Sequence, residues 1–186
     1  MGEYKSRFNS RHERIMHFEK MCKQFNVEVD VVPLIEMGFF DGPSSINHHG
    51  CYEGGNYDHS VEVAEKLIDL TNKGLAVWKN PRSPWVVGIF HDICKADTYE
   101  EKPREDGKPR SWDYKEKQYL SGHGDKSVMM LSSMLRLTEE EMLCIRYHMG
   151  AYRKEDWDCY DMAIRKYETV LWTHTADMYA AKVKNI

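Results

Sequence analysis

Apolar residues recur at helical spacing along most of this 186-residue chain, whereas the alternation typical of strands is nearly absent. The clearest case is Asp58 to Asn72, where most apolar side chains fall on one helical face and Gly74 follows the end. Further helices are expected over residues 3–25, 30–40, 85–95, 123–135, 138–149 and 160–183. The pattern therefore predicts an all-α fold, with a strand left open as an alternative for the short apolar segment 85–95.

Two segments interrupt the helical pattern. The first is a loop rich in turn-forming residues that holds two adjacent histidines, and loops often carry site residues. The second is dense in charge, contains Pro103 and Pro109, and has aromatic residues on either side, which favours an exposed β-hairpin flap. We expect a single domain over residues 1–186, with an N-terminal helix in 1–25, a site loop at 41–57 and the flap at 97–117.

The composition excludes several classes of protein. Hydrophobic residues make up 41% of the chain, enough to bury a core and too many for a disordered chain. The longest apolar run is far shorter than the ~20 residues of a membrane helix, and no leader segment is recognised, so we expect a cytoplasmic protein without a membrane partner. The net charge of -4 gives no overall attraction to nucleic acid. Five scattered cysteines without a C-x-x-C pair indicate neither a disulfide framework nor a thiolate zinc site.

The pair His91-Asp92 stands where the nearly continuous apolar helix Trp85 to Phe90 ends. Taken alone, the pair could equally be a structural contact. Burying both side chains without partners would cost a few kcal/mol, and a metal ion would remove that cost. Further candidate ligands stand on other expected helices, at intervals of 25 to 32 residues along the set: His59, His123, His148 and Asp177. This spacing is expected if successive helices of a bundle each direct one ligand inward.

The candidate ligands offer nitrogen and oxygen atoms without thiolate. Such a set suits Mn, Fe, Co, Ni or catalytic Zn rather than a structural zinc site. In this order the residues resemble the H...HD...H...H...D signature of the HD-domain metal-dependent phosphohydrolases, over nearly the whole chain. Three local runs add to the resemblance: His91-Asp-Ile-Cys-Lys95 is similar to H-D-I-G-K, the run from Asn47 to His59 is similar to that before the first ligand of HD-domain exoribonucleases, and Thr175-Ala-Asp177 is similar to the closing aspartate helix.

The resemblance implies an all-helical HD domain that binds two divalent ions and hydrolyses a phosphoester with metal-activated water. It assigns His59, His91, Asp92 and Asp177 to the first ion, and His123 and His148, with Asp92 bridging, to the second. Cys94 departs from the family pattern because glycine is usual there. The exoribonucleases also carry a nucleic-acid-binding domain for which this chain has no room, which favours a nucleotide or similar small phosphorylated substrate over a polymer.

Four further side chains are candidates for the reaction itself. Lys95 lies three residues after Asp92 on the same helical face and could reach a phosphate oxygen, or it could merely complement the helix dipole. His48 or His49 could protonate the leaving oxygen, or both could be solvated loop residues. Arg153 is a weaker candidate for a phosphate contact.

Two other functions remain open. Some HD-domain proteins hold two irons with the same ligand set and activate dioxygen, so an oxygenase is one alternative. A nonenzymatic nucleotide sensor that kept the pocket is the other. In the flap, Trp112 and Tyr114 could stack on a base, although an aromatic cross-strand pair that holds the hairpin together is the more economical interpretation.

Overall fold

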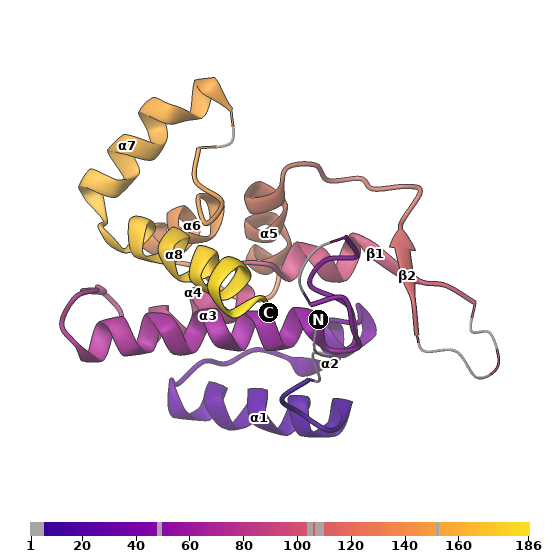
Figure 1. Ribbon diagram of the computed structural model, residues 1–186. Coiled ribbons are helices and arrows are strands. Elements are labelled where there is room, and N and C mark those ends of the chain that lie inside the picture. Colours follow the sequence, from indigo (N-terminus) through magenta and orange to yellow (C-terminus); the bar gives the residue numbers. More distant parts are fainter. Residues whose placement is uncertain (1–5, 48–49, 104–105, 107–109, 152) are drawn as a thin grey trace.

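A computed structural model describes residues 6–47, 50–103, 106, 110–151 and 153–186. Within these residues the chain is mainly helical and has one two-stranded antiparallel sheet, as expected (Figure 1). The elements in chain order are α1 (Arg11–Gln24), α2 (Val31–Glu36), α3 (Gly55–Asn72), α4 (Ser83–Phe90), η1 (Ile93–Asp97), β1 (Tyr99–Glu101), β2 (Trp112–Tyr114), α5 (His123–Ser132), α6 (Glu139–Arg146), η2 (Lys154–Asp156), α7 (Trp157–Lys166), α8 (Thr169–Met178) and η3 (Tyr179–Lys184). Here η1 and η2 are 3-10 helices and η3 is a π-helical turn.

Helices α3 and α4 cross closely at the centre of the core. A Cβ atom added to Gly88 of α4 would lie 2.3 Å from the Cα of Ala64 on α3, so only glycine allows this approach. The crossing fixes where α4 ends relative to α3. It therefore places His91 and Asp92, which follow α4, beside His59 of α3.

Several helices differ in extent from the sequence prediction. The helix expected over 30–40 ends at Glu36, the one expected over 85–95 ends at Phe90 and is followed by η1, and α3 begins at Gly55 rather than Asp58. Residues 6–10 are not helical, and α1 begins at Arg11 because the Ser10 side chain caps it by accepting a hydrogen bond from the Glu13 amide at 3.2 Å. The helix expected over 160–183 is divided into α7, α8 and η3, because the backbone of Tyr167 is extended at φ -141° and ψ 100°. The Tyr167 hydroxyl donates to Glu139 Oε2 at 2.8 Å, which ties the break to α6.

A capping box begins α6. Thr138 Oγ1 accepts from the Glu141 amide at 3.2 Å, and a Glu141 carboxylate oxygen accepts from the Thr138 amide at 2.8 Å. Glu141 is also held by Arg82, which precedes α4, with a nitrogen–oxygen distance of 3.1 Å. This contact joins the start of α6 to the start of α4. None of the helices in the described residues is both long and apolar enough to cross a bilayer.

The hairpin expected at 97–117 is present and projects from the helices at the right of Figure 1. Tyr99 lies opposite Tyr114 and forms the aromatic cross-strand pair, whereas Trp112 lies opposite Glu101. Asp97 anchors the base of the hairpin through its contacts with lysines on both sides. Its carboxylate lies 2.9 Å from Lys115 Nζ, next to β2, and 2.9 Å from Lys126 Nζ of α5.

Candidate metal centre

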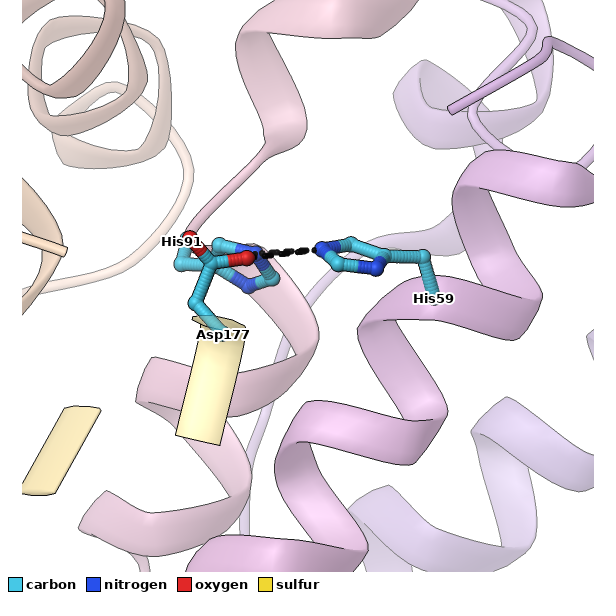
Figure 2. Close-up of side chains that lie close together, drawn as sticks. All are labelled: His59, His91 and Asp177. Carbon is cyan, nitrogen blue, oxygen red and sulfur yellow. Dashed lines mark hydrogen bonds and ion pairs between the residues drawn. The ribbon is translucent and has the colours of Figure 1, made fainter. Parts of the chain in front are cut away.

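The side chains of His59, His91 and Asp177 meet between α3, α4 and α8 (Figure 2). His59 Nε2 lies 3.0 Å from Asp177 Oδ1 and 3.2 Å from His91 Nε2. The distance from His91 Nε2 to Asp177 Oδ1 is 3.7 Å. Two ligand atoms that are each ~2.1 Å from one ion and about 90° to 110° apart would lie ~3.0 to 3.4 Å from each other. The spacing of the three side chains is therefore close to that of a coordination shell.

Asp92 connects this group to two more histidines. Its Oδ2 lies 3.6 Å from His59 Nε2 and 3.5 Å from His91 Nε2. Its Oδ1 lies 2.5 Å from His123 Nε2 and 3.4 Å from His148 Nε2. Each carboxylate oxygen thus faces a different pair of imidazoles, the arrangement needed for a bridging ligand. The structure brings together all six side chains that the sequence singled out as ligands.

Backbone carbonyls orient three of the imidazoles. The Nδ1 atoms of His59, His91 and His148 lie 2.8, 2.8 and 2.7 Å from the carbonyl oxygens of Ile186, Gly88 and Ile145 respectively. A carbonyl oxygen only accepts, so each Nδ1 carries the proton and donates it. The Nε2 lone pairs are then directed into the cluster, as in histidines that bind metals through Nε2.

His148 supplies an independent indication of a ligand. Its side chain is fully buried, and within the described residues its Nε2 atom accepts no hydrogen bond. The nearby Asp92 Oδ1 at 3.4 Å cannot donate while that carboxylate is ionised. Leaving a buried acceptor unsatisfied costs about 1 to 3 kcal/mol, and coordination of a cation would remove this cost. The nitrogen and oxygen donors present therefore fit a divalent ion.

The charges of the cluster are strongly coupled. Burial lowers the pKa of His91, but the carboxylates of Asp92 and Asp177 raise it to about 10. Burial likewise opposes the effect of Asp92 on His123, whose pKa is raised to about 10. Burial raises the pKa of the two aspartates, but their cationic neighbours outweigh this effect. Lys95 and the histidines hold the pKa of Asp92 well below its usual value, and His59 and His91 do the same for Asp177. Protons and a divalent cation would compete for the same nitrogen atoms.

Lys95 lies where the sequence predicted. Its Nζ atom is 2.6 Å from Asp92 Oδ2 and donates to Ser44 Oγ at 3.3 Å. Ser44 belongs to the loop at 41–57, so this loop does contribute to the site, although through a residue that the sequence did not single out. His48 and His49 of the same loop lie outside the described residues.

The cluster opens into a pocket of about 730 Å³. Its lining includes the candidate ligands Asp92, His123 and Asp177, the cations Lys95, Arg146, Arg153 and Lys182, and the side chains Ser44, Ser45, Tyr99, Tyr114, Met149 and Met178. The side chain of His123 is 37% exposed, whereas those of His59, His91 and His148 are fully buried. A small molecule in the pocket therefore reaches the cluster past His123, with Arg153 in the same wall.

Two further contacts surround the candidate ligands. The Nδ1 atom of His174, three residues before Asp177, lies 2.8 Å from the backbone oxygen of His148. Cys94, at the position that departs from the family pattern, places its Sγ atom 3.4 Å from Nδ1 of His123. A thiol thus takes the place that a carbonyl has beside the other three imidazoles.

The chain was compared with known proteins in three ways. No model of a known protein family, no curated protein and no solved structure matches it.

Proposed function

We propose that this chain is an HD-type phosphohydrolase that uses two divalent ions to cleave a phosphoester of a nucleotide or similar small molecule. The observation that carries the proposal is the convergence of six side chains from five helical segments and their ends into one cluster. Their order along the sequence is that of the HD signature. The two oxygens of Asp92, each facing two imidazoles, support a pair of ions rather than one.

The ions would be held by the two groups of ligands that share Asp92. When bound, they would neutralise charge on the phosphate oxygens and lower the pKa of a water molecule from 15.7 to ~7. The chain itself contributes the orientation of the ligands, because carbonyl oxygens hold the Nδ1 protons of His59, His91 and His148. It also excludes bulk water from these three rings, which are fully buried.

Lys95 is the side chain best placed to contact the phosphate. An ammonium group has three donors, and two of the Lys95 contacts are Asp92 and Ser44. A third N–H can therefore be directed to a nonbridging phosphate oxygen in the pocket that Lys95 lines. Arg153 lines the same pocket and is proposed as a second phosphate contact.

The test is a panel of nucleoside mono-, di- and triphosphates, cyclic nucleotides and short oligonucleotides, assayed with Mn, Co, Ni and Mg. We expect release of phosphate or of a nucleoside monophosphate from at least one small nucleotide, and none from the Asp92→Ala variant. A protein that binds two metal equivalents and hydrolyses none of these compounds would contradict the proposal.

Two further measurements would distinguish the other functions. Uptake of dioxygen by iron-loaded protein, with no phosphate release under nitrogen, would favour an oxygenase. Saturable nucleotide binding without turnover in any metal would favour a sensor. Phosphate release under nitrogen contradicts both.

A further inference from the structure

The pocket beside the cluster has aromatic and apolar side chains that the hydrolytic chemistry does not use. They include Tyr99 of β1, Tyr114 of β2, Met149 and Met178. Met149 directly follows the ligand His148, and Met178 directly follows the ligand Asp177. Tyr114, Met149 and Met178 are 48%, 43% and 36% exposed. Large apolar side chains left accessible beside a reaction centre are typical of a surface that a ligand covers.

The two tyrosines form a fixed platform. Their ring centroids are 5.2 Å apart with the ring planes inclined at 51°, and the strand register places them opposite each other, so a base would stack on one ring and meet the other at an angle. Asp97 holds the base of this hairpin through 2.9 Å contacts with Lys115 and with Lys126 of α5. Because the platform is already ordered, little conformational entropy is lost when a ligand binds to it.

The platform lies next to the proposed phosphate contact. Consecutive serines lie beside the two groups: Lys95 donates to Ser44 Oγ at 3.3 Å, and Ser45, whose side chain opposes the rise that burial causes in the pKa of Tyr99, lines the same pocket. Tyr99 is also separated from Lys95 by only three residues, which form the end of η1 and its cap. A molecule with its phosphate at Lys95 would therefore extend toward the tyrosines.

We propose that the Tyr99–Tyr114 pair binds the base of a nucleotide whose phosphate lies at Lys95. This inference rests on the proposed hydrolase function and adds the substrate group that the enzyme selects. Tyrosine rings stack on flat aromatic groups, and the thioethers of Met149 and Met178 make favourable contacts with aromatic rings. Stacking tolerates any base, so the subsite distinguishes nucleotides from sugar phosphates without selecting one base.

The experiment compares adenosine 5′-monophosphate with ribose 5-phosphate, which lacks the base, in manganese-loaded protein. Stacking of one base corresponds to a preference of roughly 10- to 100-fold in kcat/KM for the nucleotide. We expect Tyr114→Ala to reduce this preference about tenfold, mainly through KM, because stacking is binding that the ground state and transition state share. Tyr114→Phe keeps the ring and should restore most of the preference. Tyr119→Ala, at a 93% exposed tyrosine outside the pocket lining, is the matched control.

Three results would overturn the base subsite. The first is an equal kcat/KM for the two compounds in the wild type. The second is an unchanged preference for the nucleotide in Tyr114→Ala. The third is an equal loss of kcat/KM for both compounds in Tyr114→Ala, with an unchanged melting temperature. The first of these leaves the hydrolase function intact. If neither compound releases phosphate, equilibrium dialysis decides the subsite, and the wider panel of nucleotides decides the hydrolase function separately. Weaker binding of adenosine 5′-monophosphate by Tyr114→Ala than by Tyr119→Ala supports it, whereas equal binding or none overturns it.

Discussion

Asp92 contacts both groups of histidines, His59 with His91 through one oxygen and His123 with His148 through the other. Replacing this carboxylate leaves each group one ligand short and removes a negative charge from both. We therefore expect Asp92→Ala to lose both metal equivalents and all hydrolysis. Elemental analysis after dialysis measures the first effect. Asp69→Ala, on the exposed face of α3, is the control and should keep both equivalents. Two equivalents in Asp92→Ala would contradict the bridging role.

Lys95, unlike Asp92, is not proposed as a metal ligand. It contacts Asp92 and Ser44 instead. Lys95→Ala should keep the bound metal but lower kcat by about 100-fold, the effect of removing one preorganised group that stabilises transition-state charge. The measurement is kcat with saturating substrate, together with metal content on the same sample. Lys102→Ala, at an exposed lysine that pairs with Asp113 in the hairpin, provides the comparison. Loss of metal from Lys95→Ala would instead assign Lys95 the role of holding Asp92 in place.

The raised pKa values of His91 and His123, each about 10, give the metal-free protein a characteristic pH dependence. A histidine in the unfolded chain has a pKa of ~6.5, so protonation of these rings stabilises the fold fully below about pH 6.5. This contribution is lost as the pH rises toward 10. We expect the free energy of unfolding of metal-free protein to fall between pH 6.5 and 8.5.

Metal-loaded protein should not show this fall, because a cation replaces the protons and binds more tightly as the pH rises. Urea titrations at several pH values, with chelator or with metal, would measure both slopes. Equal stability of the metal-free protein at pH 6.5 and 8.5 would contradict the assignment of stabilising protons to His91 and His123.

At the scale of the elements, the crossing of α3 and α4 sets the distance between His59 and His91. Gly88→Ala would place a Cβ atom 2.3 Å from the Ala64 Cα, so the helices must separate. Overpacking of this kind typically costs about 1 to 3 kcal/mol. We expect a loss of stability in that range and weaker metal binding, measured by denaturant unfolding and by metal titration. Gly42→Ala, where an added Cβ would meet the Gly38 oxygen at 3.5 Å, is the control.

The sequence predicted those helices whose start or end is marked by a pattern within the same segment. The capping box of Thr138 and Glu141 and the one-sided apolar pattern before Gly74 lie within single segments, and α6 and α3 are found there. The division between α7 and α8 was not predictable in this way. It depends on the contact of Tyr167 with Glu139, 28 residues away. A long-range contact of this kind overrides a continuous helical pattern.

The difference between local sequence patterns and long-range contacts also decides which residues of the site could be predicted. The convergence of the six clustered side chains could be predicted because they stand on five different helices or directly beyond their ends, and their order carries the information. Ser44 and Tyr99 could not, because their roles depend on how the loop at 41–57 packs against η1 and the hairpin. Neither residue has a local pattern that separates it from an ordinary loop or strand residue.

At the scale of the whole molecule, the cluster joins segments that the chain itself leaves far apart. His59 and Asp177 are 118 residues apart in sequence, yet their side chains are 3.0 Å apart in the fold. Because the unfolded chain cannot present these side chains together, metal in the proposed centre would bind the folded state almost exclusively and stabilise it by mass action. At a free metal concentration of about 100 times Kd, the gain is ~2.7 kcal/mol.

We therefore expect the melting temperature to rise with added manganese or cobalt and to fall again with a chelator. For a chain of this size, ~2.7 kcal/mol corresponds to a shift of roughly 5 to 11 °C. Asp177→Asn keeps the size of the side chain but removes its charge, and should lose most of this shift. The metal-free melting temperatures of the two proteins, measured in parallel, separate ligand loss from general destabilisation. A metal-induced rise of the same size in Asp177→Asn would show that the ions bind elsewhere, and the proposed centre would be wrong.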